Sequence, residues 1–380
     1  MIHEDERAEP SEQLGFVLHL GDFIYEVVQY PEDAATRYDR RIVEIVRLAD
    51  SLKVGNFHLP VDLAGYRAIY RAYLSDPDIQ DARARWPFVA MWDNHEFSWQ
   101  GRQSLLKAGR IERPAQTLKV AANQAWFEYQ PARTTKPSGP GLDRFDPPAV
   151  GDAPLTDFDE NGLSNEPNNL AAIGSLTAYR ALRYGAHLDL IVTDQHSYRM
   201  QHPLTMAEAD GLGSPPEALS GFVPEEVVEI LDAGRAFDGA RPPDTISFAG
   251  TDTHNYRKTG APFTILGAGQ KRWFLDRLSQ SRATWKLWGN SLGALDWRAD
   301  PQNLPDGMVE RWPGAGYSNV AMDYGAAYSE RAEIYDLVRR AGITGFAIVW
   351  GARHSFWAGY AAKSLPPKAF DPVGLAFVTG

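Results

Sequence analysis

Short apolar runs that end in Gly, Asp or Asn are the feature that most constrains the fold of this chain. Five such runs occupy residues 16–20, 88–92, 188–193, 285–288 and 346–350. They are too short for helices and rich in β-branched and aromatic residues, which is typical of buried strands. Turns at strand ends are where an α/β enzyme assembles a site from distant parts of its chain. The pattern therefore predicts an α/β fold with functional residues at its strand ends.

Helical segments lie between these runs, and we expect them at 118–129, 224–233, 270–280 and 330–341. Ser329 is a suitable N-cap for the last helix, and Gly342 is the expected residue after its end. Because helical and strand segments interleave over the whole length, we expect a single domain over residues 1–380.

Residues 131–169 differ from the rest of the chain. They are dense in Pro, Gly, Asp and Asn and show little periodicity. This composition predicts a long irregular insertion loop, which we place near the rim of the site. Residues 299–324 are expected to form a second irregular stretch.

The composition excludes some classes of site and partner. The chain has 380 residues and a formal net charge of −11, which argues against broad nucleic-acid binding because that requires a basic surface. A small phosphate ester still fits as a substrate, since bound cations can supply local positive charge. The chain has no cysteine, so disulfides and thiolate metal ligands are excluded.

Neither a membrane span nor an export signal is expected. No run approaches the ~18 apolar residues that a membrane helix needs. Residues 1–7 are acidic and polar, unlike a signal peptide, and look like the tail of a helix. Because a strand follows almost at once, we expect the chain to begin inside a longer fold.

The first motif is Gly-Asp-Phe-Ile-Tyr at residues 21–25, directly after the first apolar run. The carboxylate of Asp22 can bridge two cations at a strand end. Tyr25 can offer a phenolate, which is a good ligand for a hard ion such as ferric iron. The alternative is an ordinary Gly-Asp turn with Tyr25 packed in the core, and this motif by itself supports both interpretations equally.

The second motif is Asp-Asn-His-Glu at residues 93–96, after the second run. Asn94 offers a neutral oxygen ligand, and His95 can protonate a leaving oxygen or bind the phosphoryl group. Glu96 is expected to orient His95. The alternative is a helix cap in which Asp93 and Glu96 form a capping box. A cap leaves His95 unexplained, so we favour the functional interpretation.

Weaker candidates follow the later runs. His354, in residues 351–355, is a natural imidazole ligand. Without the other two motifs, we would interpret it as a histidine hydrogen-bonded in a loop. Asn290 either ligates a metal or starts a turn. For a further set of polar residues the loop interpretation is favoured: Asp194, His196, Arg199, Asp252 and His254. Residues 157–162 have the opening of a calcium loop, but Asn168 stands where its bidentate Glu belongs, so we predict a polar turn.

These motifs resemble the calcineurin-like metallophosphoesterases, in the Gly-Asp-x-x-Tyr form. The Trp-Asp-Asn-His-Glu sequence at 92–96 is similar to Trp-Asp-Asp-His-Glu of the alkaline phosphatase D (PhoD-like) branch. Residues 353–359 look like the end of its closing Gly-Asp-x-His motif with the usual trailing residues. The resemblance runs from about Leu14 to the C-terminus.

The resemblance implies two packed mixed β-sheets flanked by helices, an αββα sandwich. It implies that Asp22 bridges the metals, Tyr25 and His354 ligate iron, Asn94 ligates the second metal and His95 is catalytic. The metals would be Fe(III) with Ca(II), or Mn(II) or Zn(II) in the second site. Members of the branch are commonly exported.

Two departures bear on metal binding. The first strand of the family, which carries its earliest ligand, has no counterpart here. The Asp of the closing motif is Ala352, which removes one ligand carboxylate. From the resemblance we expect hydrolysis of phosphomonoesters or phosphodiesters by a metal-activated hydroxide with His95 assisting. The two departures support the alternative, a catalytically impaired metal-binding or interaction protein.

Overall fold

The computed structural model describes residues 1–37, 39–132, 144–205, 222–248, 251–295, 297–299, 316–319, 327–363 and 369–379. By its internal contacts the chain divides into two compact units. The first comprises residues 1–157 and 164–180, and the second comprises residues 158–163 and 181–380. That the two units form a single domain over residues 1–380 is still a prediction.

The first unit is built on two short parallel strands. Strand β1 (Val17–His19) pairs with β6 (Phe88–Ala90), and the Met91 N–H continues the ladder by donating to the His19 carbonyl over 2.9 Å. Because the strands are parallel, both turns that follow them emerge at the same edge. The 3-10 turn η1 (Asn94–Glu96) belongs to the second of these turns.

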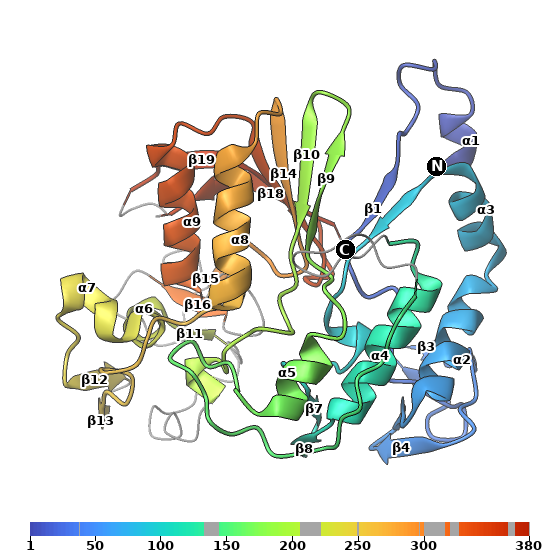
Figure 1. The fold of residues 1–380 in the computed structure, drawn as a ribbon, viewed down its shortest axis with the longest axis horizontal. Helices are drawn as coiled ribbons and strands as arrows, with labels where there is room; N and C mark the ends of the chain where they lie inside the picture. The colour runs from blue at the N-terminus through green and yellow to red at the C-terminus, as the bar shows by residue number, and fades with distance from the viewer. Residues whose placement is uncertain are drawn as a thin grey trace. The chain divides into compact units, whose positions relative to one another are not determined.

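Helices and hairpins complete the first unit (Figure 1). The helices are α1 (Ile2–Asp5), α2 (Leu63–Leu74), α3 (Pro77–Arg85), α4 (Gln116–Tyr129) and α5 (Pro167–Ile173). The hairpins are β2 (Thr36–Arg37) with β3 (Arg40–Arg41), β4 (Ser51–Val54) with β5 (Phe57–Pro60), and β7 (Leu105–Ala108) with β8 (Ile111–Pro114). Tyr66 and Ile69 of α2 and Trp126 of α4 form one buried cluster with Ala90 and Trp92, at and beyond the end of β6.

The second unit contains a mixed six-stranded sheet of order β18-β19-β17-β14-β10-β9. Its central strands are parallel, and β18 is antiparallel to β19. The strands are β9 (Arg180–Tyr184), β10 (Leu188–Val192), β14 (Trp285–Asn290), β17 (Phe346–Trp350), β18 (Trp357–Ala362) and β19 (Pro372–Val378).

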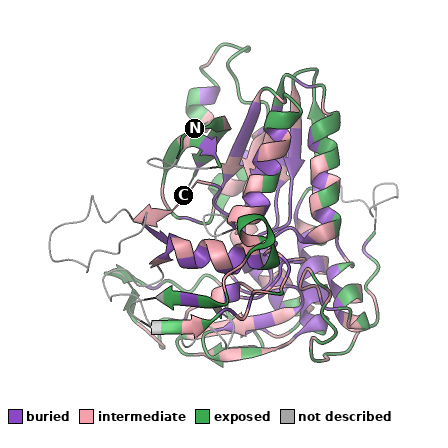
Figure 2. Ribbon diagram, turned by 90° about the vertical axis from the view of Figure 1, so that its left-hand side faces the viewer, coloured by how far each residue is buried: buried purple, intermediate pink, exposed green. Residues whose placement is uncertain are grey.

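Two long helices cover the core of this sheet. Phe274 of α8 (Gly267–Gln280) and Ile334 of α9 (Tyr328–Arg340) are fully buried in one cluster with Trp288 and Ile348 from the strands. Figure 2 shows long helices with buried residues on one side and exposed residues on the other, as expected for amphipathic covering helices.

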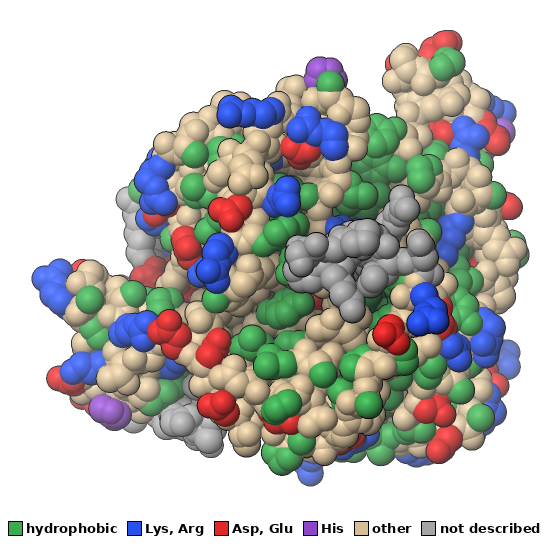
Figure 3. Space-filling view, viewed as in Figure 1, with side chains coloured by type: hydrophobic (Ala, Val, Ile, Leu, Met, Phe, Trp, Pro, Cys, Tyr) green, Lys and Arg blue, Asp and Glu red, His purple; other side chains and the backbone are tan. Residues whose placement is uncertain are grey.

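Smaller elements complete the second unit. They are η2 (Pro203–Thr205), β11 (Phe222–Pro224), α6 (Glu225–Ala233), η5 (Gly234–Ala236), α7 (Phe237–Ala240), β12 (Thr245–Phe248), β13 (Thr251–His254), β15 (Arg298–Ala299) and β16 (Tyr317–Asn319). Among the described residues no helix is both long and apolar enough to cross a membrane. On the face drawn in Figure 3, basic and acidic side chains are interspersed.

The sequence predicted the α/β class, the sheets and the flanking helices correctly. Each of the five predicted strands is present, as β1, β6, β10, β14 and β17. The described residues from 144 to 166 contain no helix or strand element, but Pro167 begins α5 inside the segment predicted to be irregular. Most of the second irregular stretch, residues 299–324, lies outside the described residues.

The predicted N-cap of α9 is wrong. Ser329 is the second residue of the helix, whose N-cap is Ala327, and both the N–H and the hydroxyl of Ser329 donate to Asp232 Oδ2 over 2.7 and 2.5 Å. Asp232 is a buried residue of α6, so a carboxylate from a distant helix binds this N-terminus. Burial raises the pKa of Asp232 to about 7, against the hydrogen bonds from Ser329, which lower it.

Asp232→Asn is expected to change how stability depends on pH. A carboxyl with a raised folded pKa keeps its proton in the folded state after the unfolded state has lost it, so stability falls as pH rises from about 4 to about 7. Asn has no proton to lose. The variant should therefore gain about 2–4 kcal/mol relative to wild type between pH 4 and pH 7.5.

Urea unfolding at both pH values measures this difference. Asp276→Asn, on the exposed side of α8, is the matched control and should show no such gain. If the free energies of unfolding of Asp232→Asn and wild type differ by the same amount at both pH values, the raised pKa of Asp232 is contradicted.

Candidate active site

The site of the first unit is formed by the two turns that follow β1 and β6. Gly21 has a φ of 102°, and a Cβ at this position would lie 2.3 Å from the Cβ of Asp93. Only glycine combines this backbone conformation with so close an approach. The next residue, Asp22, also has a positive φ, 52°, which aspartate tolerates better than most residues do. Gly21 thus brings the first turn directly against the second.

Glu96 holds both turns together. Its carboxylate is buried and accepts the backbone N–H groups of Asp22 over 3.1 Å, Phe23 over 2.8 Å and Asp93 over 2.8 Å. The bond from Asp93 is half of a capping box on η1, so the local structure expected from the cap alternative is present. The prediction that Glu96 orients His95 is wrong, because its oxygens bind backbone instead.

Glu26 orients His95. The two side chains are buried, and His95 Nδ1 lies 2.5 Å from Glu26 Oε2. The other oxygen, Glu26 Oε1, accepts the backbone N–H of Trp99 over 2.5 Å. The backbone N–H of His95 donates to Asp22 Oδ1 over 3.2 Å. The centroids of the Tyr25 and His95 rings are 4.2 Å apart. His95 is therefore fixed by contacts with both turns.

Negative charge is concentrated in this site. Burial and then the nearby carboxylate of Asp93 raise the pKa of Asp22. Burial and the charge of Asp22 raise the pKa of the Tyr25 phenol. For His95, burial lowers the pKa, but the hydrogen bond to Glu26 and the surrounding carboxylates outweigh it, so the pKa is raised. Burial is the largest cause of the raised pKa values of Asp22 and Tyr25, and the neighbouring carboxylates add to it.

The side chain of Asn94 is held by one hydrogen bond. Its Nδ2 donates to the Trp99 carbonyl over 2.7 Å, and this bond does not use Oδ1. Asp22, Tyr25 and Asn94 together offer a carboxylate, a phenol and an amide oxygen. Oxygen donors of these kinds fit a hard cation such as Fe(III), Ca(II) or Mn(II). Within the described residues, no three His, Cys, Asp or Glu side chains form a metal-binding group by themselves.

The second unit places Asn290 and His354 at one edge of its sheet. Strands β10, β14 and β17 are adjacent and parallel, so their carboxyl ends meet there. Asn290 is the last residue of β14; its Oδ1 accepts the Leu292 N–H over 3.0 Å, and its buried Nδ2 has no hydrogen-bond partner in the described part of the chain. Such a group is completed by water or a ligand. His354 follows β17 and is exposed.

Ala352 adopts a left-handed backbone conformation with a φ of 62°. Alanine is strained there, whereas glycine, asparagine and aspartate adopt this conformation more readily. The backbone at this position is therefore one that suits Asp better than Ala.

The remaining candidates are engaged in local structure. Asp194 Oδ1 accepts the N–H groups of His196 and Ser197 over 2.8 and 2.9 Å, which is a turn contact. Asp252 accepts the Ser247 hydroxyl across the hairpin of β12 and β13. In residues 157–162, Asp159 Oδ1 accepts backbone N–H groups of its own turn, from Asn161 over 2.8 Å and from Leu163 over 3.0 Å. These contacts favour the loop interpretation.

Comparison with known proteins identifies the family. The model of the PhoD-like phosphatases matches residues 3–380. The chain belongs to the PhoD-like phosphatase family.

Two relatives show how far the similarity extends. Alkaline phosphatase D of Bacillus subtilis (strain 168) is 21% identical over 349 residues, which are 92% of this chain and 42% of that protein. A solved structure of PhoD matches with a TM-score of 0.57 at 18% identity, over 99% of this chain and 52% of that one. The chain thus spans about half the length of these relatives or less.

Sequence reasoning missed two buried charged residues of the first unit. Glu26 directly follows the Gly-Asp-x-x-Tyr motif, and this adjacency was the only signal for it. Lys119 of α4 is buried with its Nζ 4.1 Å from the centroid of Trp92 and 5.1 Å from that of Phe97, the residues that flank 93–96 in the sequence. Nothing in the sequence indicated that Lys119 is buried, because a lysine in a helix is usually exposed.

Gly21→Ala is expected to lower the free energy of unfolding by about 2 kcal/mol or more, because the new Cβ meets Asp93 and the backbone is left-handed. Gly55→Ala is the matched control, since Gly55 also has a positive φ, 59°, but no atom lies within 4 Å of an added Cβ. The control should lose only ~1 kcal/mol. Equal losses in urea unfolding would show that the approach to Asp93 is unimportant.

Glu26→Gln is expected to lower the pKa of His95, because the carboxylate that stabilises the imidazolium is removed. Nuclear magnetic resonance of the histidine ring protons during a pH titration measures the midpoint directly. Glu44→Gln, at an exposed Glu paired with Arg47, should leave the midpoint unchanged. A midpoint that does not move in Glu26→Gln would contradict the role given to this residue.

Proposed function

We propose that this chain hydrolyses phosphate esters, mono- or diesters, in a metal-dependent reaction. The observation that carries the proposal is the buried Glu26–His95 pair, in which the backbone N–H of His95 also donates to the carboxylate of Asp22. The proposal is supported by membership of the PhoD-like phosphatase family. Cations bound by Asp22, Tyr25 and Asn94 would activate water and neutralise phosphate charge.

In this proposal His95 acts on the phosphoryl group through Nε2, because Nδ1 is engaged by Glu26. A proton at Nε2 can pass to the leaving oxygen or hydrogen-bond a phosphoryl oxygen. Glu26 keeps the ring in this orientation and stabilises its positive charge. Asp22 fixes the backbone at His95 as well as offering a ligand oxygen.

Asn290 and His354 are proposed as further metal ligands, as the sequence motifs suggest. Iron with calcium, or manganese or zinc as the second ion, are the proposed metals. The substrate is proposed to be a small phosphate ester.

A second candidate is a metal-binding or interaction protein with impaired catalysis. It is favoured by Ala352, which offers no ligand oxygen in a backbone conformation that suits Asp. Under this alternative Ala352→Asp should raise metal affinity and create turnover where wild type has none. If wild type is active, the same variant should change turnover less than 10-fold.

Hydrolysis of p-nitrophenyl phosphate and bis(p-nitrophenyl) phosphate tests the proposal, with Fe, Ca, Mn or Zn added singly and in pairs. We expect metal-dependent turnover that falls at least ~100-fold in His95→Ala, the loss typical of a general acid–base residue. Wild-type turnover no greater than that of His95→Ala, with every metal, would refute catalysis by this chain.

A further inference from the structure

Trp99 follows the Asn-His-Glu turn and contacts three residues of the candidate active site. Its backbone N–H donates to Glu26 Oε1 over 2.5 Å, and its carbonyl accepts a hydrogen bond from Asn94 Nδ2 over 2.7 Å. Its indole lies close to parallel with the His95 ring, at an interplanar angle of 20° and a centroid distance of 6.0 Å. One residue thus contacts the imidazole, the carboxylate that binds this imidazole, and a proposed metal ligand.

The backbone on either side of Trp99 is bound to β7. The Ser98 hydroxyl donates to the Lys107 carbonyl over 3.1 Å and accepts the Lys107 N–H over 3.0 Å. The Gln100 N–H donates to the same carbonyl over 3.2 Å. These bonds hold the peptide groups of Trp99 in place whatever its side chain is, so replacing the side chain tests the role of the indole alone.

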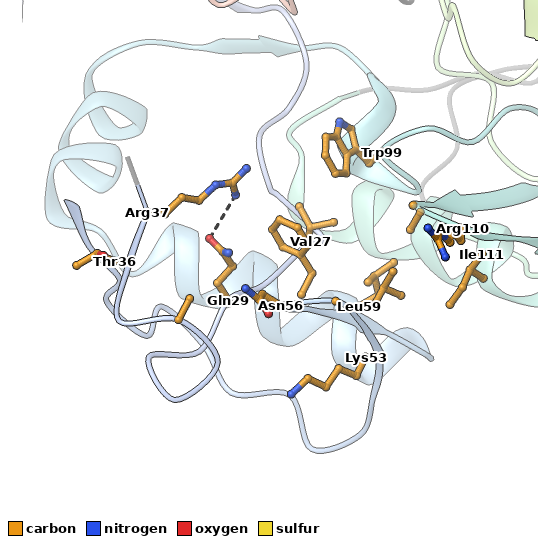
Figure 4. Close-up of a pocket in the computed structure, with 16 residues that line it drawn as sticks. Val27, Gln29, Thr36, Arg37, Lys53, Asn56, Leu59, Trp99, Arg110 and Ile111 are labelled. Carbon is orange, nitrogen blue, oxygen red and sulfur yellow. Dashed lines mark hydrogen bonds between the residues drawn. The ribbon is translucent and has the colours of Figure 1, made fainter. Parts of the chain in front are cut away.

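The indole is also in contact with an aromatic ring outside the site. Phe57 of β5 meets it edge-on, at a centroid distance of 6.1 Å and an interplanar angle of 66°, an arrangement that aromatic pairs favour. Trp99 also borders a cavity of about 800 Å³ between the hairpins β4–β5 and β7–β8 (Figure 4). Because a cavity supplies no packing atoms, the orientation of the indole depends on its aromatic neighbours.

Glu26 alone does not fix the plane of the His95 imidazole. The hydrogen bond at Nδ1 is a single contact, about which the ring can still tilt. Flat groups that lie close to parallel with the imidazole oppose this tilt, because a tilted ring would meet their atoms. Tyr25 lies at a centroid distance of 4.2 Å and an angle of 32°, and Trp99 at 6.0 Å and 20°. The direction in which Nε2 points therefore depends on both aromatic rings.

We infer that Trp99 is a positioning residue of the proposed reaction, whose indole keeps the imidazole of His95 in the plane in which Nε2 faces the phosphoryl group. The inference rests on the proposed function, since it places the phosphoryl group at His95. A misplacement on the order of 1 Å can lower a rate by about 100-fold, so a ring that only orients another residue has a large effect on turnover.

Trp99→Leu and Trp99→Phe separate the flat ring from its apolar bulk. With the chromogenic ester that wild type hydrolyses fastest, Trp99→Leu should lower kcat ~10–100-fold and leave KM nearly unchanged. Trp99→Phe keeps a flat ring and should restore most of the wild-type kcat. In the His95→Ala background, Trp99→Leu should have no further effect, because the indole acts through His95.

Trp273→Leu is the matched control for the loss of a half-buried tryptophan. Trp273 packs against the core of the second unit from α8, so this variant should lose stability in urea unfolding and keep the wild-type kcat. Equal losses of kcat in Trp99→Leu and Trp99→Phe would overturn the inference, as would the same loss from Trp99→Leu with and without His95.

Nuclear magnetic resonance at one fixed pH tests the ring contact without turnover. A nearly parallel indole shifts the ring-proton signals of His95, so these signals should move in Trp99→Leu and stay in place in Trp273→Leu. Signals that move in a wild type without turnover would sustain the ring contact and refute the proposed function. Turnover by wild type with the same kcat in Trp99→Leu would refute the positioning role alone.

Discussion

The carboxylate of Glu96 is the contact on which the candidate active site depends. It binds backbone N–H groups from the turn after β1 and from the turn after β6. One buried carboxyl thus accepts three backbone N–H groups, each bond contributing about 0.5–1.5 kcal/mol net, and it joins the two turns. Gly21 makes the arrangement possible, because any side chain there would meet Asp93. The positions of Asp22, Asn94 and His95 follow from these two residues.

A consequence of this arrangement is that several acids are buried close together. Burial and then Asp93 raise the pKa of Asp22, burial and then Asp22 and Asp93 raise the pKa of Glu96, and Glu26 is buried against His95. Holding so much negative charge away from water is costly unless cations compensate it. The positive charge of His95 compensates part of it. A bound metal ion would compensate the rest, which connects the stability of this region to the proposed chemistry.

The sequence predicted well both the strands and the turns that carry the two motifs, because both depend on local patterns. Runs such as 88–92 and 346–350 have the length and composition of buried strands wherever they occur. It failed where a contact joins distant segments. Glu26 follows the first motif and Glu96 ends the second, and which of them reaches His95 is decided by how the two turns face each other. Ser329 looked like a cap, but a carboxylate on α6, Asp232, occupies that role. The hairpins β4–β5 and β7–β8 were missed because their strands are only four residues long.

The central claim is that the turns after β1 and β6 form a cation-binding centre. Calorimetric titration of the metal-free chain with Mn(II) tests it most directly, comparing wild type with Asp22→Asn, which keeps an acceptor for the His95 N–H but loses the charge. The account predicts binding to wild type and at least ~10-fold weaker binding to the variant. Equal affinity in the two proteins, or no binding to wild type, would contradict it.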